Sequence, residues 1–165
     1  MENLNKIEYL SGKADVKREA TIPYNEKVCD FIGELSKELI LAPESKKYPD
    51  IKAFAFWCRK KNILNLRKKF LSDETRLGLG LIFHITPSNI PTNFAYSLIF
   101  GLLTGNSNIV KVPSQKFEQV LIICKSINKI LKNKYKSVRK MISIVRYQNN
   151  ANYTNKISSV CDARL

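Results

Sequence analysis

The chain has 165 residues, of which 44% are hydrophobic, and this length and composition suit one folded domain or part of a larger one. No apolar run reaches the ~20 residues of a membrane-spanning helix, and the polar N-terminus does not resemble a signal peptide. The net charge of +14 comes mostly from lysines spread over many segments, so it does not indicate a dedicated nucleic-acid-binding protein.

The first part of the chain predicts an arm followed by helices. Residues 1–22 are polar and predict an irregular arm or edge segment. Asn25 can cap a helix whose apolar residues recur at helical spacing. Pro49 suits the first turn of a second helix, whose pattern resumes to Phe70. We expect a loop at 71–75 and place a domain boundary there, with an N-terminal arm and helical segment over 1–75.

From residue 76 the pattern changes to apolar strands that alternate with helices. The segments 77–85, 108–112 and 141–147 are short apolar runs that predict buried strands, and the segments between them predict helices. This βαβαβ order is typical of a parallel sheet. A short helix over 155–160 and a further strand beginning in "DARL", 162–165, complete the prediction.

The fold class expected is therefore α/β. N-terminal helices precede a parallel, Rossmann-like βαβαβ portion, and residues 76–165 form a partial dinucleotide-binding domain. Because only the start of a fourth parallel strand is present, we expect this sheet to be incomplete.

The segment HITPSNIPTN, 84–93, follows the first predicted strand and precedes its helix. Ligands of open α/β sheets bind beyond the carboxyl ends of the strands, and a helix N-terminus there offers unpaired N–H groups. The sequence has neither a GxGxxG fingerprint nor a P-loop. The turn is therefore a candidate site of another kind.

The stretch ITPSNIPTN, followed by LLTGNSNIVKVPSQ, resembles the cofactor domain of the aldehyde dehydrogenase superfamily. More narrowly, residues 76–115 are similar to the acyl-CoA reductases of the bacterial-luminescence type, the reductase components of fatty acid reductase complexes. The resemblance implies an NADPH-dependent enzyme that converts long-chain fatty acyl thioesters to aldehydes through an acyl-cysteine intermediate.

The resemblance assigns a catalytic role to Asn89. Its side-chain amide matches the superfamily's donor to the oxyanion of the tetrahedral intermediate, and a neutral donor on a rigid turn suits that task. The alternative is that Asn89 only caps the helix that begins near Pro91.

The resemblance also implies a cofactor-binding set. The backbone of the turn would line the cofactor cleft, Lys111 would hydrogen-bond the adenosine ribose, and Ser114 stands where NAD-preferring relatives often carry Glu. Because Ser removes a negative charge, we expect NADPH to be preferred. The alternative for Lys111 is a lysine that extends to solvent. The turn residues of this set are Ile85, Thr86, Pro87 and Ser88.

The cysteines and the single histidine do not predict a metal site or a nucleophile. The four cysteines form no CxxC pair, and no second histidine exists to activate one. We expect His84 to be a packed strand residue. In the resembled family the nucleophilic Cys belongs to a second domain, so we expect it beyond Leu165 and expect this chain alone to be inactive. The cysteines are Cys29, Cys58, Cys124 and Cys161.

Two other functions remain open at this point. One is another reductase of the same superfamily, acting on a short acyl-CoA or an acyl phosphate. The other is a non-enzymatic basic binding module. We expect a cytoplasmic protein, since the cysteines are scattered and unpaired. The resemblance further implies acyl-CoA or acyl-protein substrates, acyl-protein synthetase and transferase partners, and a homo-oligomeric full-length protein.

Overall fold

The computed structural model of the chain describes residues 7–13, 16–70 and 75–165. Within these residues one sheet has the strand order β1-β4-β3-β2-β5. Strands β2 to β5 are parallel to their neighbours, whereas β1 pairs antiparallel with β4. The predicted α/β fold with a parallel βαβαβ portion is confirmed. The strands are β1 (Glu8–Ser11), β2 (Leu81–Ile85), β3 (Ser107–Lys111), β4 (Ile142–Arg146) and β5 (Ala163–Arg164).

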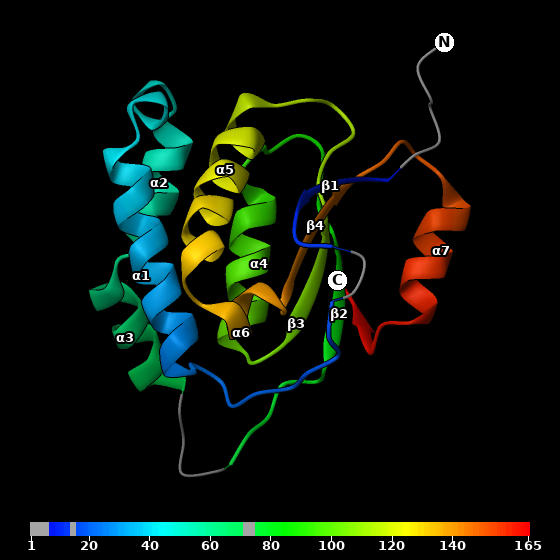
Figure 1. Cartoon of the computed structure of the whole chain (residues 1–165), viewed down its shortest axis with the longest axis horizontal. Coiled ribbons are helices and arrows are strands. Elements are labelled where there is room, and N and C mark those ends of the chain that lie inside the picture. The colour runs from blue at the N-terminus through cyan, green and yellow to red at the C-terminus, as the bar shows by residue number, and fades with distance from the viewer. Residues whose placement is uncertain (1–6, 14–15, 71–74) are drawn as a thin grey trace.

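Helices cover the two faces of the sheet unequally. Helices α1 to α6 lie on one side, and α7 lies on the other (Figure 1). None of the helices in the described ranges is long and apolar enough to cross a bilayer. The helices are α1 (Glu26–Leu41), a 3-10 helix η1 (Pro43–Lys47), α2 (Pro49–Trp57), α3 (Lys60–Phe70), α4 (Asn93–Leu103), α5 (Glu118–Asn133), α6 (Lys136–Arg139) and α7 (Ala151–Ser159).

The N-terminal helices share one hydrophobic core with the helices of the sheet. Asn25 caps α1 as predicted, because its side chain accepts a 3.0 Å hydrogen bond from the Lys27 amide. Phe31 of α1 and Phe54 of α2 are fully buried in the same cluster as Leu98 of α4. The domain boundary after residue 75 stays a prediction. Of the loop expected there, residues 71–74 lie outside the described ranges.

Strand β2 begins later than the apolar run predicted. Leu77 and Leu79 are 64% and 70% exposed, and pairing starts only at Leu81. Gly78 packs so closely on Gly105 that an added Cβ would lie 2.2 Å from its carbonyl oxygen, and Gly80 has a φ of +122°. The two glycines therefore make a bend that leads into the strand, and the leucines beside them face solvent.

The C-terminal segment forms the predicted helix and strand. Helix α7 starts at Ala151, four residues earlier than expected, because the Asn150 side chain accepts hydrogen bonds from the Asn152 and Tyr153 amides. Strand β5 pairs with β2, and the Ile85 amide donates to the Leu165 carbonyl at 2.9 Å. The chain after β5 thus lies beside the end of β2.

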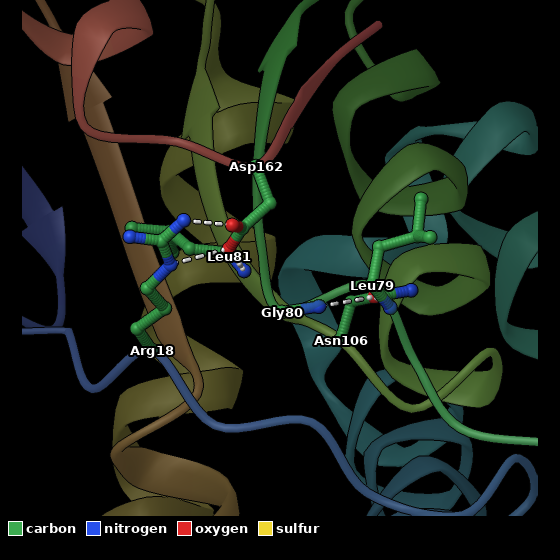
Figure 2. Close-up of polar contacts among 6 residues, drawn as sticks. All are labelled: Arg18, Leu79, Gly80, Leu81, Asn106 and Asp162. Atoms are coloured by element: carbon green, nitrogen blue, oxygen red, sulfur yellow. Dashed lines mark hydrogen bonds and ion pairs between the residues drawn. The ribbon is translucent and has the colours of Figure 1, made fainter.

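Side chains at the amino end of β2 hold the backbone in place (Figure 2). Asp162 accepts hydrogen bonds from the Leu81 amide at 2.8 Å and from Arg18 Nε at 2.7 Å, and Arg18 Nη2 contacts its other oxygen. The Arg18 contact and the Leu81 amide lower the pKa of Asp162 to about 2. The buried Asn106 side chain accepts from the Leu79 and Gly80 amides at 2.6 and 3.2 Å.

Candidate functional site

The predicted turn lies at the carboxyl end of β2, where that strand meets β3. Ile85 is in register with Lys111, the last residue of β3. The Thr86 hydroxyl and amide both donate to the Lys111 carbonyl, at 2.8 and 3.3 Å. The structure therefore brings Ile85, Thr86 and Lys111 together from two strands, at the edge of the sheet where α/β proteins bind ligands.

Asn89 stands on the exposed part of this turn. Its side chain makes no hydrogen bond with any residue in the described part of the chain. Helix α4 starts at Asn93, and its N-cap position is Thr92, so Asn89 does not cap it. The amide is thus available to a ligand or reacting group, and the helix-cap alternative is wrong. Pro87 and Ser88 are likewise exposed.

Lys111 extends from β3 across the ring of Tyr147. Its Nζ lies 5.0 Å from the ring centroid, a cation–π distance. Half-burial lowers the pKa of this ammonium, and no carboxylate pairs with it among residues 7–13, 16–70 and 75–165. A partly desolvated cation without a counter-charge suits a hydroxyl or phosphate oxygen of a ligand.

Tyr147 follows β4 and was missed by sequence reasoning. Its hydroxyl lies 3.0 Å from the Thr154 hydroxyl, and its ring meets that of Tyr153 edge to face at 5.8 Å. These contacts fix α7 against the carboxyl end of β4. Its place in the sequence could have indicated it. Tyr147 directly follows the third predicted strand, in the same way that the candidate turn directly follows the first.

Ser114 lies in the loop after β3 and is half-buried. The preceding Pro113 carbonyl accepts a 3.3 Å hydrogen bond from Arg146 Nε, and Arg146 Nη1 pairs with Glu8 Oε2 at 3.3 Å. Arg146 is buried, so this loop is tied to β4 and β1. The structure holds Ser114 near the end of β3 but shows no contact between its side chain and Lys111.

His84 is a packed strand residue, as expected. It is fully buried, with Nδ1 2.7 Å from the Ser97 hydroxyl and Nε2 2.9 Å from the Asn108 Oδ1. Burial lowers its pKa, which favours the neutral ring at pH 7. The network joins β2, β3 and α4 beneath the turn, and it leaves no ring nitrogen for the site.

The cysteines do not form an activated nucleophile. All four are unpaired, and Cys29, Cys58 and Cys124 are buried while Cys161 is half-buried. Burial raises the pKa of every one of these thiols, which disfavours the reactive thiolate. Among the described residues, no group of three His, Cys, Asp or Glu side chains is arranged to hold a metal ion.

Comparison with known proteins identifies the family. The sequence model of the family described as acyl-CoA reductase (LuxC) matches residues 23–165, most of the chain and all of the described site. No curated protein and no solved structure matches the chain. The family match agrees with the resemblance of the turn and of the β3 segment. The chain belongs to the LuxC family of acyl-CoA reductases.

Proposed function

We propose that this chain forms the cofactor-binding and oxyanion-stabilising part of an NADPH-dependent reductase of long-chain fatty acyl thioesters. The observation that carries the proposal is the exposed Asn89 amide, which has no partner in the described chain and lies on the turn beside Lys111. Family membership gives the reaction class, a fatty acyl reduction. The exposure of Asn89 and the half-buried position of Lys111 support the roles proposed for them below.

Asn89 is the proposed catalytic residue. In the reaction, a cysteine thiolate displaces the thiol of the acyl thioester to form an acyl-enzyme. When bound by Lys111 and the backbone of 85–88, NADPH would supply the hydride that reduces this acyl-enzyme, and collapse of the resulting thiohemiacetal would release the aldehyde and restore the thiolate. The Asn89 amide donates to the carbonyl oxygen as negative charge develops on it, without itself changing protonation.

The residues at the end of β3 are the proposed cofactor-binding groups. The half-buried Lys111 ammonium fits a ribose hydroxyl or a phosphate oxygen, and the backbone of 85–88 lines the adjacent edge of the sheet. Ser114 carries no charge that would repel a 2′-phosphate, which supports NADPH over NADH. Residues 76–165 thus act as a partial dinucleotide-binding domain, following the helical segment 1–75.

The nucleophile of the proposed reaction lies outside these 165 residues. Three of the four cysteines are buried and Cys161 is half-buried, burial raises the pKa of all four thiols, and the single histidine is engaged with Ser97 and Asn108. We therefore propose that the chain works as a part of a larger enzyme of the reducing cytoplasm. That enzyme is a homo-oligomer, and it receives acyl groups with the help of acyl-protein synthetase and transferase partners.

Two experiments test this proposal. Titrating the chain into NADPH should increase nicotinamide fluorescence saturably, whereas an acyl-CoA reduction assay of the pure chain should show no turnover. If the chain does not bind NADPH, the proposed cofactor site is wrong. If the chain alone turns over acyl-CoA, the claim that it lacks the nucleophile is wrong. Sequencing the coding DNA past codon 165 should find a frame that encodes a cysteine-bearing domain, and no such frame would contradict the proposed location of the nucleophile.

A further inference from the structure

A second cluster of charge lies at the opposite end of the sheet. Two adjoining cavities of about 320 Å³ each open between the end of β1, the C-terminal part of α5 and helix α6. They share Gly12, Lys13, Lys132 and Arg139 in their linings. We call them together the cationic hollow. It borders Ile142, the first residue of β4, whereas the Asn89 turn follows the last residue of β2.

The described lining of the hollow carries positive charge without acidic side chains. Among the residues that the structure describes, its lining includes five Lys and Arg side chains and neither Asp nor Glu, and none of the five forms an ion pair with another described residue. The five are Lys13, Lys132, Lys136, Arg139 and Lys140. Like charges gathered around one cavity repel each other unless an anion joins them.

The other lysines of the same region show that this imbalance is local. Along the face of α5 that meets α1 and η1, Lys125 pairs with Glu44, Lys129 with Glu38, and Lys134 with Glu34. Their N···O distances are 3.3, 2.6 and 2.9 Å. The high net charge of the chain does not by itself leave lysines without partners, because each of these three lysines pairs with a glutamate.

The walls of the hollow are fixed by hydrogen bonds between β1 and α5. The Ser11 hydroxyl donates to Asn128 Oδ1 at 2.7 Å, and Asn128 Nδ2 donates to the Leu10 carbonyl at 2.8 Å. Gly12 has a φ of +71°, and a Cβ there would lie 2.0 Å from the Ile142 carbonyl. The chain thus passes directly over the start of β4, and the cations surround a defined cavity rather than a flat surface.

We propose that the cationic hollow binds a ligand with two or more linked phosphate groups. Closely spaced phosphates match several cations that converge on one small cavity, and about 320 Å³ lies at the lower end of the range for small-molecule sites. Val16 and Ile142 add an apolar contribution to the lining, which suits an organic phosphate. This inference does not depend on the proposed reductase function.

Calorimetric titration of the chain with inorganic pyrophosphate at 0.15 M salt tests the inference, since that salt screens exposed charges beyond ~8 Å. We expect a Kd below about 1 mM. The variant Lys132→Gln/Lys136→Gln/Arg139→Gln should bind at least about tenfold more weakly. The matched control Lys125→Gln/Lys129→Gln/Lys134→Gln loses the same charge from the paired face, and should bind as the unmodified chain does.

Three outcomes would overturn the inference. No binding at millimolar pyrophosphate would do so, and so would equal weakening in the two triple variants, which would indicate an adventitious ion only. Equal affinity for a glutamate peptide of the same charge would show a surface that attracts any polyanion, such as an acidic protein. Because triple substitutions can alter stability, circular dichroism should first show that each variant is folded. The single variant Lys136→Gln, which perturbs the fold less, should also bind pyrophosphate more weakly than the unmodified chain.

Discussion

The two ends of the parallel sheet use asparagine in opposite ways. At the amino end, the buried Asn106 accepts hydrogen bonds from two backbone amides and so holds the bend before β2. At the carboxyl end, Asn89 is exposed, and its side chain contacts no polar group of the described chain. One amide stabilises the fold, and the other is available for chemistry. The two ends thus differ in whether the asparagine side chain is engaged by the backbone or left without a partner among the described residues.

The largest effect on activity should come from the carboxyl end. In the larger reductase proposed above, Asn89→Ala should lower kcat by ~10²–10³-fold, because the proposed oxyanion donor is lost. Its free energy of unfolding should change by less than about 0.5 kcal/mol, since the side chain is exposed and unpaired. NADPH consumption with a fatty acyl-CoA measures the first quantity. Asn65→Ala, on the exposed face of α3, is the matched control, and equal rates for the two variants would remove Asn89 from the mechanism.

The largest effect on stability should come from the amino end. Asn106→Ala leaves the Leu79 and Gly80 amides without their acceptor, and each unpaired donor costs ~1–3 kcal/mol. We expect unfolding to become easier by about 2–4 kcal/mol in total. Urea denaturation followed by circular dichroism measures this difference. A change as small as that of Asn65→Ala would mean that the bend before β2 does not depend on Asn106.

A smaller effect is expected for cofactor affinity at the end of β3. Lys111→Met should weaken NADPH binding by about 10–100-fold, because a hydrogen bond to a charged group contributes ~1.5–3 kcal/mol. Fluorescence titration of NADPH provides the measurement. Lys116→Met, which removes an exposed charge five residues later, should leave the affinity within about twofold. Similar losses in both variants would indicate general electrostatic attraction instead of a specific contact.

The smallest effect concerns acid stability at the amino end. Because the folded-state pKa of Asp162 is lowered to about 2, its contribution is fully present above the ordinary carboxyl pKa and is lost as the pH falls from about 4 to 2. Asp162→Asn should therefore lower the melting temperature at pH 7, where the ionised carboxylate is lost, and should flatten the decrease between about pH 4 and 2, so that the variant and the unmodified chain converge at low pH. Thermal unfolding at several pH values measures it. An unchanged dependence of the melting temperature on pH between about 4 and 2 would show that Arg18 and the Leu81 amide do not lower the pKa of Asp162.

Much of the sheet was predictable because its buried strands are continuous apolar runs. The segments ending at Ile85, Lys111 and Arg146 needed no tertiary information to be assigned as strands. The start of β2 was not predictable, because Leu77 and Leu79 continue the apolar pattern. Only the close packing of Gly78 on Gly105, between distant parts of the chain, shows why those leucines are exposed.

The location of the candidate site could be predicted from the sequence, but its surroundings could not. The turn and Lys111 were identified through their resemblance to a family, and the family match supports that resemblance. Tyr147 was missed because only the pairing of β3 with β4 brings it to Lys111. The availability of Asn89 was likewise undecided in the sequence, since its spacing from Pro91 also suited a helix cap. The start of α4 at Asn93, with Thr92 in the N-cap position, resolves that ambiguity.

The most direct test of the central claim is a two-dimensional amide NMR titration of the chain with NADPH, with pyrophosphate present to occupy the cationic hollow. We predict shifts for the amides of 85–89, Lys111 and Ser114 at the carboxyl end, and none for Leu79, Gly80 or Asn106 at the amino end. Shifts confined to the amino end, or no shifts in the turn at saturating NADPH, would contradict the assignment of the carboxyl end as the cofactor site.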